Sequence, residues 1–454
     1  MIGPPLPTPF FPTRVIMDRR LPLLLRSFAY ELRGGFLIRP FAIALSLGVL
    51  GAALSSAEEH IPALGAWVPT VLFPSRQDPQ TAQLILSAIA TSIMTVVSIV
   101  FAILLMTLTL ASTQFSPRIL VSFVRDRATQ WTLGVLLGTF SYCIAVLPAA
   151  RSLPFAFVPV VSVTGAMLLA LVAVAWLIFF IHHISQAISV NHIVDRIARD
   201  TELVIDNLMP YLRGAYEPME PAPLSDDDGA PILNLRSGYI RFIDTRRLLA
   251  LAKAWRIRVR VERRVGQFVP AGLPLLRVAH QDGVAPHQAA ELLGAFDVGP
   301  TRTLQQDVEF GVIQIVDIAL RAISPAVNDP STAISCIDQL SSILIRWCER
   351  APPPSMLFHP PHVPRVIVPW IDLEGLLNTA FDQIRHYATA DLAVNLRLLR
   401  AMSDVAATTE QPKIHAALLG RARLLVELAG KHIDGADVAR LKQRLVALEA
   451  QLAS

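Results

Sequence analysis

The chain has 454 residues, of which 53% are hydrophobic and only 17% are charged, against the quarter or so that is usual in soluble proteins. The formal net charge of +4 is too small to indicate nucleic-acid binding, and three scattered cysteines without a C-x-x-C pair suggest neither a zinc site nor a disulfide framework. The mean hydropathy is +0.49, and the apolar excess is concentrated between residues 36 and 181. Composition therefore predicts a membrane protein that also has a soluble part.

Four apolar stretches follow a tail formed by residues 1–35. They cover residues 40–57, 84–111, 131–147 and 155–181. A bilayer core about 30 Å thick is crossed by about 20 apolar residues in a helix, and a helix satisfies its own backbone hydrogen bonds in lipid. We therefore expect a four-helix transmembrane domain over residues 36–190.

Arginines mark one side of the predicted spans. Those before the first span are Arg14, Arg19, Arg20, Arg26, Arg33 and Arg39, and those between the second and third are Arg118, Arg125 and Arg127. The loop over residues 58–83 instead holds Glu58, Glu59 and Asp78 against Arg76. The positive-inside rule then places both termini, and everything after residue 181, in the cytoplasm.

Hydroxyl side chains repeat along one face of the second span, within an arc of roughly 100° on a helix. The stripe consists of Ser87, Thr91, Thr95, Ser98, Leu105 and Thr109. In one interpretation several copies of this helix line a pore, with Leu105 as an apolar constriction. In the other, the hydroxyls belong to ordinary helix packing and bond to the preceding turn. No Asp, Glu, Lys or Arg lies deep inside any predicted span, which argues against a proton relay.

The segment after the second span contains Gln114, Ser116, Pro117 and Arg118. Pro117 cannot continue a helical hydrogen-bond pattern, and it pushes Ser116 toward extended geometry. We expect a kink at the membrane surface, belonging either to an interfacial helix or to an elbow that couples a pore to the soluble part.

Gly134 and Gly138 form a G-x-x-x-G pattern in the third span. Glycines at this spacing permit close approach of another helix backbone. The motif predicts helix packing and no chemistry.

The soluble part divides into three predicted regions. Residues 191–230 are expected to be a linker helix and a polar linker, residues 231–285 a small β-rich subdomain, and residues 286–454 a helical domain. The β-region rests on strict alternation over residues 256–262, with companion strands over 238–243 and 275–278. Helical periodicity covers residues 307–323, 372–405, 412–432 and 437–452. The Pro-rich stretch of residues 351–370, which lies between the first and second of these helical regions, is expected to be a loop.

A compact turn follows the first of these helices. Ser324 and Pro325 end it, Asp329 can cap the next helix, and Pro330 suits the first position of that helix. The stretch is at minimum a helix–turn–helix corner. The alternative is a ligand or ion site at which polar residues converge, namely Arg302, Asp307, Asp317, Arg321, Asn328 and Asp329.

No catalytic constellation is evident in the sequence. There is no G-x-S-x-G elbow, Walker loop or H-E-x-x-H motif, and His182, His183 and His192 lack a standard metal-ligand spacing. We therefore expect no enzymatic activity, metal or cofactor.

Three blocks of sequence together resemble a known family. They are "TQFSPRIL" with the residues that follow to Arg127, "FIHHISQAISV", and the long block "RTLQQDVEFGVIQIVDIALRAISPAVNDPSTAISCIDQL". In this order they resemble the bacterial membrane proteins grouped as domain of unknown function 2254 (DUF2254). The resemblance implies a multi-span protein of the bacterial inner membrane with a cytoplasmic domain, and it implies no activity or catalytic residue.

The expected fold class is an α-helical integral membrane protein with four transmembrane helices and a mixed α+β cytoplasmic domain, mostly helical with a small β-subdomain. The expected function is a homo-oligomeric channel or passive transport protein, lined by the second span and regulated by the cytoplasmic domain. The alternative is a membrane-anchored binding, scaffold or signalling protein without transport. The expected partners are the lipid bilayer, further copies of the chain and a cytoplasmic ligand or protein, but not nucleic acid.

Overall fold

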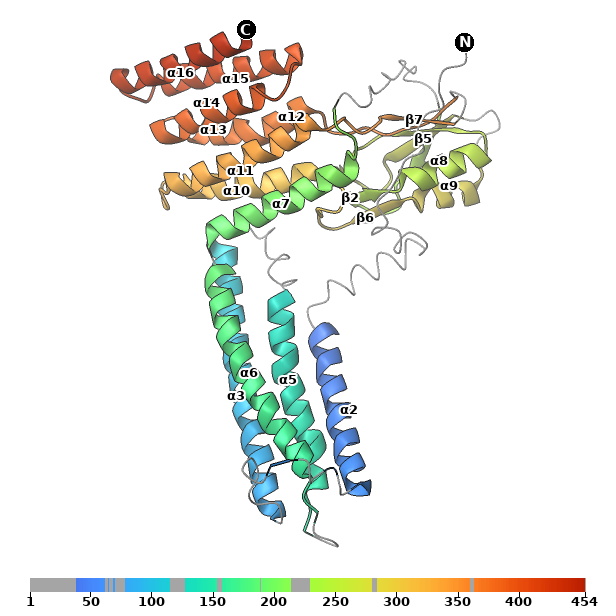
Figure 1. Ribbon diagram of the computed structural model, residues 1–454. Helices are drawn as coiled ribbons and strands as arrows, with labels where there is room; N and C mark the ends of the chain where they lie inside the picture. Colours follow the sequence, from blue (N-terminus) through green and yellow to red (C-terminus); the bar gives the residue numbers. More distant parts are fainter. Residues whose placement is uncertain are drawn as a thin grey trace, which may run out of the picture.

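The computed structural model describes residues 38–61, 64, 68–69, 78–114, 127–152, 157–187, 189–213, 229–279, 284–359 and 363–453. Figure 1 shows two parts, a group of long helices and a larger body of helices and strands beyond one end of them.

The long helices are α2 (Ile38–His60), α3 (Pro79–Gln114), α5 (Arg127–Val146) and α6 (Val160–Ala187). Within the described residues, these four are long and apolar enough to cross a membrane, the third together with the short 3-10 helix η4 (Leu147–Ala149). The four predicted spans are therefore confirmed as helices. With 36 residues, α3 is about 54 Å long and exceeds a bilayer core of about 30 Å.

Close packing of α5 against α2 depends on glycine. A Cβ at Gly134 would lie 2.5 Å from Ile43 Cδ1, and one at Gly138 would overlap the Leu47 side chain. From the other side, a Cβ at Gly51 would lie 3.0 Å from the Tyr142 carbonyl oxygen. The prediction that the G-x-x-x-G pattern serves helix packing is confirmed, and the partner helix is α2.

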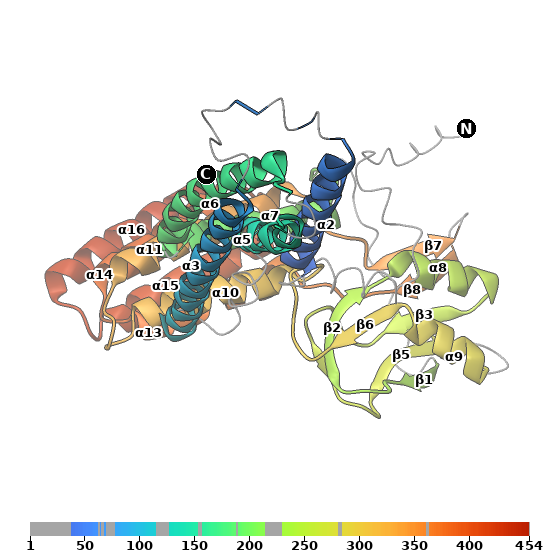
Figure 2. The same ribbon diagram turned by 90° about the horizontal axis from the view of Figure 1, so that it is seen from below.

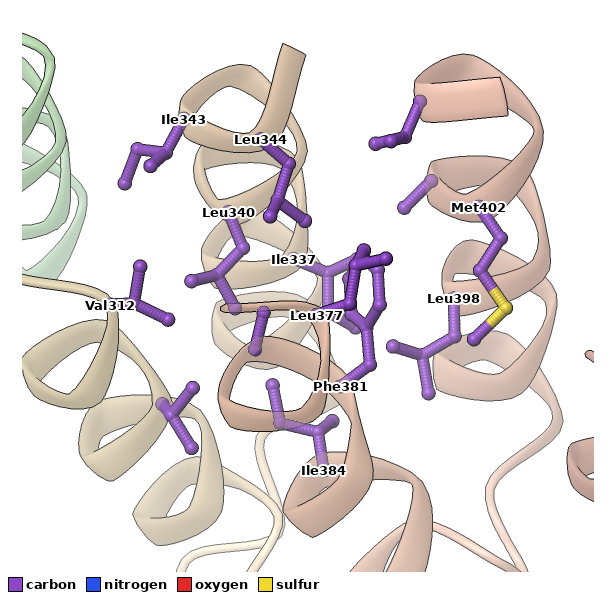
Figure 3. Close-up of a cluster of buried hydrophobic side chains, with 14 of the residues drawn as sticks. Val312, Ile337, Leu340, Ile343, Leu344, Leu377, Phe381, Ile384, Leu398 and Met402 are labelled. Carbon is purple, nitrogen blue, oxygen red and sulfur yellow. The ribbon is translucent and has the colours of Figure 1, made fainter. Parts of the chain in front are cut away.

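The helical portion of the soluble body surrounds one apolar core. Its helices are α7 (Val190–Leu208), α10 (Val308–Ala322), α11 (Pro330–Glu349), α12 (Leu373–Leu377), α13 (Gln383–Tyr387), α14 (Leu392–Ala406), α15 (Pro412–Ala429) and α16 (Gly435–Ala453). Figure 3 shows Ile337, Leu340, Phe381 and Leu398 meeting in this core, where all four side chains are fully buried.

Helix α7 belongs to this core and is not a separate linker. Its apolar face, which includes Ile197 and Ile205, is buried with residues of α10 and α11. The predicted assignment of residues 191–230 to a linker is therefore wrong for the helix itself, because an amphipathic helix next to a large domain buries its apolar face there.

The helix expected over residues 372–405 is interrupted. A π-helical turn, η5 (Asn378–Asp382), separates α12 from α13, and α14 begins after Asp391, whose side chain accepts a hydrogen bond of 2.9 Å from the Val394 N–H. The Asp391 cap starts a new helix where periodicity alone suggested continuation.

The strands form two sheets. The strands are β1 (Ala230–Leu233), β2 (Gly238–Ile243), β3 (Arg258–Val261), β4 (Phe268–Val269), β5 (Pro274–Ala279), β6 (Phe296–Gly299), β7 (Met356–His359) and β8 (Val363–Ile367). One sheet has the order β1-β5-β3-β8-β7 and the other β4-β2-β6, and helices α8 (Thr245–Ala254) and α9 (Pro286–Leu293) accompany them. The three predicted strands are confirmed as β2, β3 and β5.

The predicted boundary at residue 285 is too early. Strand β6 lies beyond it, and the Pro-rich stretch expected to be a loop contains the β7–β8 hairpin. Strand β8 pairs in parallel with β3, with Val366 opposite Val259. Pro364 pairs with Phe358 next to a register shift, where a strand tolerates a residue without an N–H.

The strands lie to one side of the membrane helices. In Figure 2, seen from below, the four helices stand over α7 and its neighbours, while both sheets are displaced from them. The chain is therefore a mostly helical membrane protein with a mixed sheet region, as the sequence predicts.

Candidate functional site

The hydroxyl stripe of α3 faces away from the other helices of its own chain. Ser87, Thr91, Thr95, Ser98 and Thr109 are exposed, and Leu105 is 64% exposed. The buried face of α3 is instead formed by apolar residues that include Leu86, Ala90 and Val97. Packing within one chain therefore does not explain why hydroxyls occupy this face. The stripe would contact lipid, water or another copy of the chain.

Three of the stripe hydroxyls bond to their own helix. Thr95 Oγ1 donates to the Thr91 carbonyl at 3.1 Å, Ser98 Oγ to the Met94 carbonyl at 3.0 Å, and Thr109 Oγ1 to the Leu105 carbonyl at 2.9 Å. A hydroxyl bonded in this way can face lipid, and its oxygen keeps accepting capacity for another donor.

The predicted elbow is described only at its first residue. Gln114 is the last residue of α3, whereas Ser116, Pro117 and Arg118 lie outside the described residues. The kink at Pro117 therefore stays a prediction.

Arg302 and Asp307 meet at the start of α10. Arg302 Nε donates to Asp307 Oδ2 at 2.8 Å, and Arg302 Nη2 donates to Asp307 Oδ1 at 2.9 Å. Asp307 also caps the helix, accepting from the Phe310 N–H at 3.1 Å, and its side chain is only 3% exposed. The Arg302 guanidinium lies over the Phe310 ring, 5.5 Å from its centroid. Burial is the largest single effect and lowers the pKa of Arg302, but the hydrogen bonds and charges of Asp307 and Glu309 together outweigh it, so the pKa is raised.

Sequence reasoning missed two further members of this cluster, Glu309 and Arg264. Arg264 donates from Nη1 and Nη2 to the two Glu309 carboxylate oxygens, both at 3.0 Å. Arg302 Nη2 donates to Glu309 Oε2 at 2.9 Å, and Thr379 Oγ1, in the π-helical turn, donates to Glu309 Oε1 at 3.3 Å. We call Arg264, Arg302, Asp307 and Glu309 the α10 clamp.

The α10 clamp is electrically balanced and joins the sheet region to the helices. Burial raises the pKa of Glu309, but the hydrogen bonds and charges of Arg264 and Arg302 outweigh it, so the pKa is lowered. Two guanidinium groups thus face two carboxylates. A paired set of this kind holds structure together and offers no group poised for proton transfer.

Glycine is required beside the clamp. Gly266 has a φ of +87°, and a Cβ there would lie 2.6 Å from Arg302 Nη2 and 2.9 Å from Asp307 Cγ. A hollow of about 20 Å³ adjoins the cluster, lined in part by Arg264, Trp347 and Trp370, and it has room for about one water molecule. This hollow itself is too small for a metabolite.

The opposite end of α10 carries the helix–turn–helix corner. Asn328 has a φ of +49°, which asparagine tolerates, and Asp329 caps α11 by accepting from Thr332 N–H at 3.1 Å and Thr332 Oγ1 at 2.6 Å. The bond from Thr332 Oγ1 lowers the pKa of Asp329. The predicted cap and corner are confirmed.

The six residues considered as one site do not converge. Arg302 and Asp307 lie at the start of the 15-residue α10, and Asn328 and Asp329 lie just past its end, about 20 Å away at 1.5 Å per residue. Asp317 and Arg321 belong to the second half of the same helix. The Arg302–Asp307 pair is brought together but lies far from Asn328 and Asp329, because a helix keeps its two ends apart.

Glu58 was also missed as a structural residue. It is 3% exposed near the end of α2 and accepts from the Val161 N–H at 2.8 Å, so it caps the start of α6. The predicted span ended at residue 57, and only the Glu58–Glu59 doublet could have signalled a buried carboxylate.

Among the described residues, no group of three or more His, Cys, Asp or Glu side chains is placed to hold a metal ion.

Four apolar helices that carry an α+β body define a multi-span membrane protein. The chain belongs to the family described as predicted membrane protein DUF2254, which it matches over residues 33–404. It is similar to uncharacterised proteins from Mycobacterium bovis and Mycobacterium tuberculosis, each 33% identical over 407 residues, which cover 88% of this chain and 77% of the relative. No solved structure matches the chain.

Proposed function

We propose that this protein is a homo-oligomeric channel or passive transport protein of the bacterial inner membrane. In this proposal α3 lines the path, and the soluble body lies in the cytoplasm and regulates the path. The observation that carries the proposal is the uncovered hydroxyl stripe of α3, defined by Ser87, Thr91, Thr95, Ser98, Leu105 and Thr109.

The charges at the two ends of the helices support the cytoplasmic placement. Arg39 and Arg127 lie at the end next to the soluble body, whereas Glu58, Glu59 and Asp78 lie at the other end. Basic residues accumulate on the cytoplasmic side of a bacterial membrane. A tag after Ser454 should be accessible only from the cytoplasm, and labelling from the periplasm would reverse the orientation.

The stripe has the chemistry of a weakly selective path. Several copies of α3 around an axis would present hydroxyl groups to water, and Leu105 would form an apolar ring that closes by dewetting. No charged residue lies on the stripe, so strong selection between cations and anions is not expected.

The proposal assigns no reaction to the chain. The charged side chains of the α10 clamp are paired with one another, and the described residues contain no metal-binding group. We accordingly treat the soluble body as a regulatory or binding domain.

A second candidate is a membrane-anchored scaffold or signalling protein without transport. It is favoured by the hydrogen bonds of Thr95, Ser98 and Thr109 to their own helix, because a stripe satisfied in this way does not need water. In that case the stripe would contact lipid or pack against a second copy.

Flux from liposomes containing the purified full chain separates the two candidates. If the protein is a channel, the liposomes should release small ions. The rate of release should be reduced by Thr95→Leu and increased by Leu105→Ser. Leu171→Ser on α6 is the matched control, because Leu171 is 68% exposed but lies on another helix. Absence of flux in the wild type and in Leu105→Ser would remove the channel and leave the scaffold.

A further inference from the structure

Two arginines from different helices converge on the π-helical turn η5. Arg385 lies on α13, three residues after Asp382, and Arg421 reaches the turn from α15. Their side chains are 13% and 12% exposed, so both are mostly buried. Every residue from 363 to 453 is described, and the elements that form this cluster lie within that range.

One carboxylate approaches both arginines, and it does so at long range. Asp382 Oδ1 lies 3.8 Å from Arg385 Nη2 and 3.8 Å from Arg421 Nε, which exceeds the length of a hydrogen bond. Among the described residues, no second carboxylate forms an ion pair with either arginine. The cluster therefore holds two positive charges against one negative charge.

Both arginines also keep buried donors without acceptors. Within the described part of the chain, Nε of Arg385 and Nε of Arg421 are buried and have no hydrogen-bond partner. Arg421 is held in place by its other nitrogens, since Nη1 donates to the Ala417 carbonyl at 2.9 Å and Nη2 donates to Asn378 Oδ1. A buried donor without an acceptor is costly, so an anion that supplied acceptors here would be bound favourably.

The backbone turn and the exposure of Asp382 fit a binding role. Turn η5 covers five residues between α12 and α13, and π-helical turns inside helices are frequent at functional sites. Arg421 contacts both ends of the turn, at Asn378 and at Asp382. The Asp382 side chain is 39% exposed, so its carboxylate can turn toward water and leave the two guanidinium groups to an anion from solution.

Position and charge select the class of ligand. Figure 1 shows α15 on the side of the soluble body away from the long helices, beyond α10 and α11, which argues for a soluble ligand over a lipid headgroup. Guanidinium groups match the oxygens of phosphate in geometry and charge. A phosphate dianion would balance both arginines, whereas a carboxylate ligand would only repeat the single charge of Asp382.

We propose that Arg385 and Arg421 form a binding site for a soluble phosphate dianion. Asp382 lies next to both guanidinium groups when the site is empty and turns outward when phosphate binds. The phosphate oxygens then accept hydrogen bonds from both arginines. The site is separate from the hydroxyl stripe of α3 and does not depend on transport.

The test measures binding of inorganic phosphate to the full chain in detergent, by titration calorimetry at neutral pH and physiological salt. The wild type should bind, and Arg385→Gln should weaken binding at least about tenfold, since charge-assisted contacts are lost. Asp382→Asn should tighten binding at least about threefold, because a competing negative charge is removed. Phosphate should raise the unfolding temperature of the wild type and of Asp382→Asn more than that of Arg385→Gln.

A matched control removes one positive charge from the same helix. Arg423 lies two residues after Arg421 on α15, its side chain is 61% exposed and paired with Glu449, and Arg423→Gln should bind phosphate as the wild type does. No binding by the wild type, equal weakening in Arg423→Gln, or unchanged binding in Arg385→Gln would overturn the proposal. Unchanged or weaker binding in Asp382→Asn would show an ordinary ion pair instead. Competition by added phosphatidylglycerol would assign the site to lipid and also overturn it.

Discussion

Glu58 of α2 receives two hydrogen bonds from Ser162 of α6, one from the backbone N–H and one from the hydroxyl, both at 3.2 Å. Ser162 in turn accepts a hydrogen bond of 3.0 Å at its carbonyl from the Tyr142 hydroxyl of α5. Three membrane helices are thus joined at the end away from the soluble body. A carboxylate from one helix satisfies N–H groups that another helix leaves unpaired at its start.

Replacement of this cap should loosen the helix bundle. We expect Glu58→Ala to lower the free energy of unfolding by about 1–2 kcal/mol, because the Val161 and Ser162 N–H groups lose their acceptor. Thermal unfolding of the detergent-solubilised protein measures the change. Glu58→Gln retains one acceptor oxygen and should lose less, and equal losses in the two variants would contradict the capping role.

Removal of the Glu309 charge should destabilise the junction between the sheets and α10. In Glu309→Gln, Arg264 and Arg302 lose a charged partner inside the clamp, and we expect a loss of about 3 kcal/mol. Glu427→Gln is the control, since that side chain is 66% exposed in an i,i+4 pair and should change stability by less than about 0.5 kcal/mol. Similar values for both variants would show that the clamp is not a stabilising element.

The clamp also predicts a dependence on pH. The pKa of Glu309 is lowered from 4.5 in the folded protein, so ionised Glu309 stabilises the fold above pH 4.5. This contribution is lost as the pH falls through the lower, folded-state pKa. Chemical unfolding measured from about pH 6 down to about pH 3 should show stability falling in the wild type and falling less in Glu309→Gln. Parallel curves would assign the acid sensitivity to other carboxylates.

The contact between α7 and α10 depends on Gly311. A Cβ at Gly311 would collide with Thr201 Oγ1 and lie 2.9 Å from Thr201 Cβ. We expect Gly311→Ala to cost about 2–3 kcal/mol, with partial recovery in Gly311→Ala/Thr201→Ala, as measured by thermal unfolding. Gly420→Ala in α15 meets nothing within 4 Å and should instead stabilise the protein by up to about 1 kcal/mol. Destabilisation of equal size at both positions would contradict the steric explanation.

Sequence patterns predicted the elements whose formation depends on residues close together in the chain. Apolar length identified the four spans, strict alternation identified β3, and the Asp329–Pro330 pair identified the start of α11. Each of these features is encoded within a window of about 20 residues or fewer.

Contacts between distant residues could not be read from the sequence. The Pro-rich stretch is expected from its prolines to be a loop, yet β8 forms there because β3, more than 100 residues earlier, offers it a partner. Arg264 joins Glu309 across 45 residues, and only the folded chain reveals that the pair completes the cluster around Arg302. The convergence of Arg302 and Asp329, which we considered as an alternative to a structural corner, does not occur, since helix α10 lies between them.

The short connection between α6 and α7 has a mechanical consequence. Helix α6, one of the four helices long and apolar enough to cross a membrane, ends at Ala187, and α7 starts at Val190 with its apolar face buried in the core of the soluble body. Because only two residues separate the helices in the sequence, a displacement of the end of α6 would move the start of α7 and, through it, the core that buries α7. The position of α6 and the position of the soluble body are therefore coupled through α7.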